Sequence, residues 1–345
     1  MSLKKANLDW SLLGFNAVKT RSMFCATCHK GEKWSGGSLI PYGNIEISPA
    51  AAVLNYGQGV FEGTKAFHTS KDNIVLFRVD DNAERMARST KRLCIPKMDH
   101  DFFINAIVTT VKDNLDYIPP YGKGSMYIRP IVWGTAPTLG VNASSDYTFI
   151  VFVSPVGPYF KGRKKSLNLK IETNYHRAAE KGIGNAKAIG NYSASLYPML
   201  KAKEEGFDEV IYLDSVCGDK IEEIGSANLF IVNDGIIKTP RLSRSILAGI
   251  TRDSVCRIAS DLLGLKVEQT DIFLKDLFEA DEVFCTGTAV GVTPIGKITF
   301  NDEAHEFNRG KIGPITNKCK RKLINIQRQH IDDTFGWLFP ITDKK

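Results

Sequence analysis

The segment Gly182-Ile183-Gly184-Asn185-Ala186-Lys187-Ala188-Ile189-Gly190-Asn191-Tyr192 places one lysine among small residues, directly before an expected helix. Small neighbours leave room for a bulky planar ligand at the amine. Desolvation at such a site would favour the neutral, nucleophilic form of a lysine that forms a Schiff base. A surface lysine in a glycine-rich loop would look the same in isolation, so Lys187 becomes a candidate catalytic residue only together with the other segments described below.

Strands and helices are interspersed on the C-terminal side of this segment. Apolar periodicity and turn residues predict a helix over 192–205, a strand over 208–214, a hairpin over 228–239 that turns at Asn233-Asp234-Gly235, an amphipathic helix over 251–263, and strands over 265–269 and 281–288. The region from there to about Trp337 is mostly polar.

On the N-terminal side the pattern is richer in hairpins. It predicts strand, loop and strand over 39–67, a strand over 74–77, helices over 81–93 and 102–114, and strands over 125–133 and 147–154. Together the two sides predict an α+β protein with two domains.

The segment Pro155-Val156-Gly157-Pro158, followed by a basic polar stretch, predicts an interdomain linker over 156–165. The expected domains are therefore a small N-terminal α/β domain over 1–155 and a larger C-terminal domain over 166–345. A ligand is expected in the cleft between them.

The composition is that of a globular protein, with 345 residues, 43% of them hydrophobic, and a formal net charge of +7. The densest basic clusters, Arg163 to Lys165 and Lys318 to Lys322, are not interleaved with aromatic residues, so we expect no nucleic-acid partner. No apolar run is long enough to cross a bilayer, and no membrane partner is expected. We expect a cytoplasmic protein, with the plastid or the mitochondrial matrix as alternatives if a transit peptide was removed.

Seven cysteines without a visible secretion signal predict reduced thiols. Cys25-Ala26-Thr27-Cys28-His29 has the spacing of a c-type haem attachment site. A redox-active or metal-binding cysteine pair is a further hypothesis. We favour a chance match, and the dispersed histidines indicate no metal site. A redox or haem-binding module at Cys25 and Cys28 stays open as the alternative of another class.

Six ordered motifs carry a specific resemblance. They are Leu54-Asn55-Tyr56-Gly57-Gln58-Gly59-Val60-Phe61-Glu62-Gly63, Tyr127-Ile128-Arg129-Pro130, Lys187-Ala188-Ile189-Gly190-Asn191-Tyr192, Glu222-Glu223-Ile224-Gly225-Ser226-Ala227-Asn228-Leu229-Phe230, Gly249-Ile250-Thr251-Arg252, and Asp281-Glu282-Val283-Phe284 with Gly287-Thr288-Ala289. In this order they resemble the branched-chain amino acid aminotransferases. These are class IV aminotransferases of fold type IV, and they use pyridoxal 5′-phosphate. The resemblance runs from about Asp9 to Trp337.

The resemblance implies a fold like that of D-amino-acid aminotransferase, with a C-terminal pseudo-barrel domain and the cofactor in the interdomain cleft. It implies a homodimer that transfers the amino group of leucine, isoleucine or valine to 2-oxoglutarate and gives branched 2-oxo acids and L-glutamate. Three alternatives within the fold remain: a D-amino-acid aminotransferase, an aminodeoxychorismate lyase, and a methionine or other 2-oxo-acid aminotransferase.

For the cofactor, the resemblance implies a role for each matching residue. Lys187 would form the Schiff base and then carry the proton at the substrate α-carbon. Glu223 would lie against the pyridine nitrogen, and Tyr192 would hydrogen-bond the 3′-oxygen. The phosphate and its surroundings would be held by Arg85, Leu247, Gly249, Ile250, Thr251 and Thr288, with Ile250 and Thr251 at the positive end of the helix expected over 251–263.

For the substrate, the resemblance implies that the carboxylate meets Tyr127, Arg129 and the backbone at Thr288 and Ala289. An apolar side-chain pocket would be lined by Tyr56, Phe61 and Tyr159, with Leu139 and Val141 reaching in from a second subunit. Without the resemblance, Arg85 would be interpreted as a solvated helix residue, and Tyr56 and Phe61 as core aromatics.

Overall fold

The computed structural model describes residues 5–159 and 166–342 and divides into two compact units. Unit 1 consists of Met1–Tyr159, Ala186–Gly190 and Asn325–Lys345, and unit 2 of Phe160–Asn185 and Asn191–Ile324. This division differs from a single cut at the expected linker, because two later segments return to unit 1. Residues 160–165 of that linker, with the basic cluster at 163–165, lie outside the described residues.

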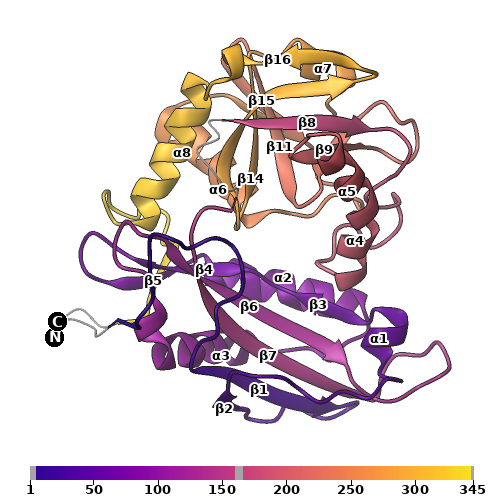
Figure 1. Cartoon of the computed structure of the whole chain (residues 1–345), viewed down its shortest axis with the longest axis vertical. Coiled ribbons are helices and arrows are strands. Elements are labelled where there is room, and N and C mark those ends of the chain that lie inside the picture. The colour runs from indigo at the N-terminus through magenta and orange to yellow at the C-terminus, as the bar shows by residue number, and fades with distance from the viewer. Residues whose placement is uncertain (1–4, 160–165, 343–345) are drawn as a thin grey trace. The chain divides into compact units, whose positions relative to one another are not determined.

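Unit 1 is built on an eight-stranded sheet in which the strand pairings are antiparallel (Figure 1). The order is β17-β5-β4-β6-β7-β1-β2, and β3 also pairs with β6. The strands are β1 Ser22–His29, β2 Ser38–Pro41, β3 Gly59–Phe61, β4 Thr64–His68, β5 Ile74–Phe77, β6 Ser125–Gly134, β7 Asp146–Val156 and β17 Leu338–Pro340.

Side chains of β6 alternate between the two faces of this sheet. Met126, Ile128 and Val132 are buried, whereas Tyr127 and Arg129 are only half-buried on the opposite face. The period of two therefore brings both predicted carboxylate-binding residues to one side of the sheet.

The helices of unit 1 are α1 Ala52–Tyr56, α2 Val79–Arg92 and α3 His100–Asp113, with a 3₁₀ turn, η1, at Leu115–Tyr117. Acidic residues in the first turn of α2 and basic residues in its last turn complement the helix dipole. α2 packs against α3 and β3, and α3 packs against β1 and β7. The helices expected over 81–93 and 102–114 are confirmed, while α1 falls where a loop was expected.

The cysteine pair with haem-like spacing lies in β1. Residues three apart on a strand point to opposite faces, and here Cys25 is half-buried while Cys28 is buried. The Cys28 thiol contacts the carbonyl oxygens of His29 and Glu32, and the His29 ring lies 2.8 Å from an Asp146 carboxylate oxygen. Strand pairing and core packing account for these residues.

Unit 2 is built on a nine-stranded mixed sheet in the order β10-β9-β8-β15-β14-β11-β12-β13, with β16 on β15 (Figure 1). β10 also pairs with β11, which closes the path from β10 to β11 into the expected pseudo-barrel. The strands are β8 Leu167–Glu172, β9 Glu209–Leu213, β10 Ile221–Ile224, β11 Ala227–Asn233, β12 Ile236–Pro240, β13 Val267–Thr270, β14 Glu282–Gly287, β15 Gly291–Phe300 and β16 Glu303–Glu306.

The core of unit 2 fills the inside of this sheet with aliphatic side chains, among them Leu169, Leu229, Ile231 and Ile295. The hairpin expected over 228–239 is confirmed as β11 and β12. Its turn has left-handed backbone at Asp234 (φ 48°) and Gly235 (φ 76°), which Asp and Gly tolerate.

The remaining helices lie wholly or mainly in unit 2. They are α4 Ile189–Ala194, α5 Leu196–Glu204, α6 Ile250–Arg257, its π-helical continuation η2 Ile258–Leu262, α7 Leu274–Phe278, the 3₁₀ turn η3 Asn308–Gly310, and α8 Pro314–Gln327. The helix expected over 251–263 is confirmed as α6 with η2, and that over 192–205 is present as two helices. The polar C-terminal region carries β15, β16 and α8, whose first N–H groups bind the Glu282 carboxylate.

Two segments that are distant in sequence join unit 1 through backbone pairing. Ala188 forms a bridge with Val60, and β17 pairs with β5. Within the described part of the chain, every helix is too short or too polar to traverse a lipid bilayer.

Candidate active site

Lys187 is fixed to unit 1 by its backbone. Its carbonyl oxygen accepts the N–H of Phe61 at 3.1 Å, and its own N–H donates to Ser89 Oγ at 3.0 Å. The Lys187 amine lies 4.9 Å from the centroid of the Phe61 ring. Contacts from β3 and α2 therefore hold the lysine in one place although its segment is rich in small residues.

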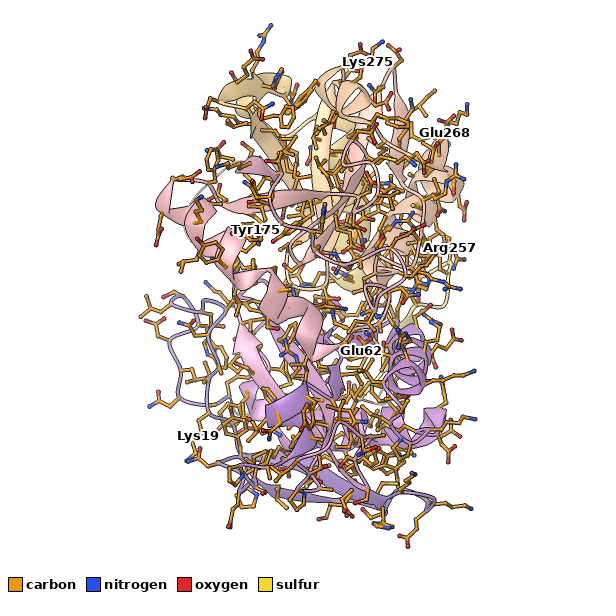
Figure 2. The ribbon with its side chains drawn as sticks, turned by 90° about the vertical axis from the view of Figure 1, so that its right-hand side faces the viewer. Lys19, Glu62, Tyr175, Arg257, Glu268 and Lys275 are labelled. Atoms are coloured by element: carbon orange, nitrogen blue, oxygen red, sulfur yellow. The ribbon has the colours of Figure 1, made fainter. Side chains whose placement is uncertain are left out.

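Next to Phe61, the fully buried Glu62 forms a bidentate ion pair with Arg85. Arg85 Nε and Nη2 donate to the two carboxylate oxygens at 2.7 and 2.8 Å. Asn82 Nδ2 and the N–H of Gly63 also donate to Glu62 Oε2, at 2.7 and 3.1 Å. Figure 2 labels Glu62 among the side chains of unit 1. The interpretation of Arg85 as a solvated residue is wrong, because this helix position is 4% exposed.

The charge of Glu62 follows from its neighbours. Burial by itself would raise the pKa of this carboxyl group, but the positive charges of Arg85 and Lys187 and the hydrogen bonds from Arg85 and Asn82 outweigh it. The pKa is therefore lowered below its ordinary value. Glu62 is thus an anion at neutral pH in spite of its burial.

Arg129 contacts both Tyr127 and Phe61. Arg129 Nη2 donates to Tyr127 Oη at 3.1 Å, and the guanidinium carbon lies 4.7 Å from the Phe61 ring centroid. Gly63 lies close to the Tyr127 hydroxyl, and a Cβ on Gly63 would come 2.1 Å from Tyr127 Oη.

The strand register pairs Lys65 with Tyr127. Burial together with the charge of Arg328 lowers the pKa of Lys65 to about 8.

The remaining predicted substrate residues of unit 1 lie in two places. Tyr56 Oη donates to the carbonyl oxygen of Leu139, on a loop where Leu139 is 89% and Val141 82% exposed. Tyr159 packs edge-on against Phe15 at 4.9 Å, and Phe15 packs in the same way against Tyr127 at 5.1 Å. Phe15 thus connects two predicted substrate residues.

In unit 2, the buried Glu223 is held by groups from three segments. Its Oε1 accepts the N–H of Leu247 and, at 3.4 Å, Nδ2 of Asn228. Its Oε2 lies 3.5 Å from Nε of Arg177, and both side chains of this pair are buried. The Arg177 Nη2 group donates to the carbonyl oxygens of Gly184 and Ser245.

The start of α6 has the features of an anion-binding position. The helix begins at Ile250 after Gly249, so the N–H groups of Ile250 and Thr251 lie in its first turn. A Cβ at Gly249 would come 1.9 Å from Oδ1 of Asn228, the residue whose amide also binds Glu223 and the carbonyl oxygen of Leu247. Three predicted cofactor residues, Leu247, Gly249 and Glu223, therefore share the contacts of Asn228.

Three other predicted residues of unit 2 are half-buried. Thr288 and Ala289 directly follow β14, and Tyr192 lies in α4. Among residues 5–159 and 166–342, no three His, Cys, Asp or Glu side chains are grouped so that they could hold a metal ion.

Sequence reasoning missed the residues that support the predicted ones: Phe15, Glu62, Lys65, Asn82, Ser89 and Arg177. One signal was available for Glu62. It is a charged residue in an otherwise apolar and glycine-rich run, and a buried carboxylate needs a cationic partner. The sequence does not indicate which of its many arginines that partner is.

Comparison with known proteins matches this chain to a described family. A family model, amino-transferase class IV, matches residues 59–298. The chain is 44% identical over 336 residues to a chloroplastic branched-chain amino acid aminotransferase of Humulus lupulus, covering 97% of this chain and 82% of that protein. It is 40% identical over 338 residues to a methionine aminotransferase of Arabidopsis thaliana, covering 98% and 95%.

A solved structure agrees in fold with the chain. The branched-chain aminotransferase of the thermophilic archaeon Thermoproteus uzoniensis, determined with norvaline, has a TM-score of 0.80 and 29% sequence identity. The match covers 94% of this chain and 100% of that one.

Proposed function

The chain belongs to the class IV aminotransferases, which have fold type IV. From this premise we propose that it transfers the amino group of leucine, isoleucine or valine to 2-oxoglutarate, with pyridoxal 5′-phosphate as cofactor. The observation that carries the proposal is the setting of Lys187. Its amine lies over the Phe61 ring, beside the buried anion of Glu62 and on the unit that also carries Tyr127 and Arg129.

The side chains present fit this cofactor. Lys187 supplies an amine for the aldehyde, Arg85 and the first turn of α6 supply donors for a phosphate, and Glu223 supplies a buried carboxylate for the pyridine nitrogen. When bound, pyridoxal phosphate supplies an electron sink for the negative charge that develops at the substrate α-carbon.

Each residue then has a definite task. The Lys187 amine takes up and returns the proton at the α-carbon. The Glu223 carboxylate, held by Leu247 and Asn228, would keep a proton on the ring nitrogen, and Tyr192 would donate a hydrogen bond to the 3′-oxygen. Ile250, Thr251, Thr288 and Arg85 would hold the phosphate.

The substrate residues account for a dual specificity. Arg129 and Tyr127 offer a cation and a hydroxyl to a carboxylate, while Phe61 and Tyr159 offer apolar surface to a branched side chain. The same Arg129 would neutralise the second carboxylate of glutamate. Tyr56 and the backbone at Thr288 and Ala289 complete the set.

A homodimer is part of the proposal. Leu139 and Val141 are large apolar side chains that are strongly exposed in a single chain, and a second subunit would cover them. The proposed compartment is the cytoplasm, with the plastid or the mitochondrial matrix as alternatives.

An amino-donor panel tests the proposal. The protein loaded with pyridoxal phosphate is incubated with 2-oxoglutarate and each L- or D-amino acid, and glutamate is measured. We expect high kcat/KM for L-leucine, L-isoleucine and L-valine. Higher kcat/KM for D-amino acids, for methionine, or lyase activity on aminodeoxychorismate would identify one of the alternatives and contradict the proposal. A haem spectrum would support the module at Cys25 and Cys28 instead.

A further inference from the structure

We propose that Glu62 is a positioning residue for the cofactor phosphate: its carboxylate holds the Arg85 guanidinium in the one orientation in which the outer edge of that group can bind phosphate oxygens. This inference rests on the proposed function, since it assigns Arg85 to the phosphate of pyridoxal phosphate. The sequence analysis assigns no role to Glu62 and names no residue that would orient Arg85.

The geometry of the pair sets the orientation of the arginine. Glu62 contacts the edge of the guanidinium formed by Nε and Nη2, at 2.7 and 2.8 Å. Two parallel hydrogen bonds fix the plane of the group as well as its position. The opposite edge, formed by Nη1 and the second hydrogen of Nη2, is directed away from Glu62 and has the forked geometry that matches a phosphate.

Glu62 can act as a fixed support because it is itself immobilised. Its N–H donates to the carbonyl oxygen of Pro130 at 2.8 Å, which ties the residue to β6. Asn82 and Gly63 bind the carboxylate from the side of α2 and from the following residue. The carboxylate is 0% exposed, so water does not compete for Arg85.

The charge of Glu62 matters as well as its shape. The charges of both Arg85 and Lys187 act on Glu62. A buried arginine without an anion is costly, and a long flexible side chain would then adopt other orientations. A glutamine has nearly the same size, but it presents an NH₂ group to the arginine and removes the charge.

The test separates phosphate binding from ring binding. Apoprotein is titrated with pyridoxal 5′-phosphate and, separately, with pyridoxal, which lacks the phosphate, and both dissociation constants are measured by absorbance. For Glu62→Gln we expect the constant for pyridoxal phosphate to rise by about 10- to 100-fold while that for pyridoxal stays within about twofold. As a matched control, Glu282→Gln removes a buried carboxylate of unit 2 that binds the start of α8, and it should change neither constant.

A double variant shows whether Glu62 acts through Arg85. In an Arg85→Met background, Glu62→Gln should weaken pyridoxal phosphate binding by no more than about twofold further, because the arginine that it positions is gone. If the two effects multiply, or if Glu62→Gln weakens both ligands equally, Glu62 has only a structural role and the inference is wrong.

A milder variant covers the case in which Glu62→Gln does not fold. Asn82→Ala removes one of the donors that hold Glu62 and leaves the ion pair in place. We expect it to weaken pyridoxal phosphate binding by about threefold and to spare pyridoxal, and an equal weakening of both ligands would overturn the inference. Failure of the wild-type apoprotein to bind pyridoxal phosphate would refute the proposed function itself.

Discussion

The two units each contain a buried glutamate paired with an arginine, and the two pairs differ in geometry. In unit 1, Glu62 and Arg85 share two short hydrogen bonds of 2.7 and 2.8 Å. In unit 2, Glu223 and Arg177 approach only to 3.5 Å, and Nε of Arg177 has no hydrogen-bond partner among the described residues.

This difference in geometry indicates that the two buried carboxylates are oriented by different partners. Glu62 is held chiefly by its arginine, so its position and that of Arg85 depend on each other. Glu223 is oriented by Leu247 and Asn228, while Arg177 is oriented by backbone carbonyl oxygens and acts on Glu223 through charge alone. We therefore expect Glu62 to govern stability and phosphate binding, and Glu223 to govern turnover.

The largest effect is expected for turnover in Glu223→Ala. Loss of this carboxylate removes the group that we propose to keep the ring nitrogen protonated, so kcat with leucine should fall by about 10²- to 10⁴-fold. Steady-state kinetics at saturating cofactor measure it. Retention of ordinary kcat would refute the role assigned to Glu223.

The next effect is a loss of stability in Glu62→Ala. Because the variant leaves the buried Arg85 without its anion, the free energy of unfolding of the apoprotein should fall by about 3–5 kcal/mol in denaturant titrations. A double variant, Glu62→Met with Arg85→Met, should regain much of this loss since no unpaired charge remains. Equal losses in the single and double variants would show that the pair is not held in this way.

Arg177→Met should have a smaller effect on stability. Glu223 keeps the Leu247 N–H and the Asn228 amide, so we expect a loss of about 1–2 kcal/mol in the same titration. A loss as large as that of Glu62→Ala would remove the distinction between the two pairs.

The smallest effect concerns pH and Lys65. The pKa of Lys65 is lowered to about 8, so the folded protein releases this proton at a lower pH than the unfolded chain, in which a lysine has a pKa of about 10.4. The unfolded state therefore binds more protons between these values, and the stability of the apoprotein rises with pH across that interval. Lys65→Met should flatten the rise, whereas Lys297→Met, at an exposed position, should leave it unchanged; a rise that persists in Lys65→Met would assign it to another group.

Local pattern predicted much of the fold. β5 was expected at residues 74–77, and α2, α3 and the hairpin of β11 and β12 were expected nearly where they lie, because each has clear periodicity or a specific turn. β1 was not predicted, because its small and polar residues, such as Ala26, Thr27 and His29, give only a weak apolar alternation. β15, β16 and α8 were missed because their half-exposed residues weaken the apolar period.

The candidate site was predictable only in part, for a physical reason. Lys187, Tyr127 and Arg129 belong to motifs that the sequence displays. Within unit 1 the fold brings Lys187 and Arg129 to Phe61, and Tyr127 to Arg129. The burial of Arg85 was not predictable, because it depends on Glu62, a residue in a different element. Contacts between elements, such as Phe15 with Tyr127 and Tyr159, leave no local signal.

The central claim is that Lys187 is the residue that binds the cofactor covalently. Protein loaded with pyridoxal 5′-phosphate is reduced with borohydride and digested, and the peptides are analysed by mass spectrometry. We predict a phosphopyridoxyl group on the peptide that contains Lys187. The same group on another lysine, with Lys187 unmodified, would contradict the account.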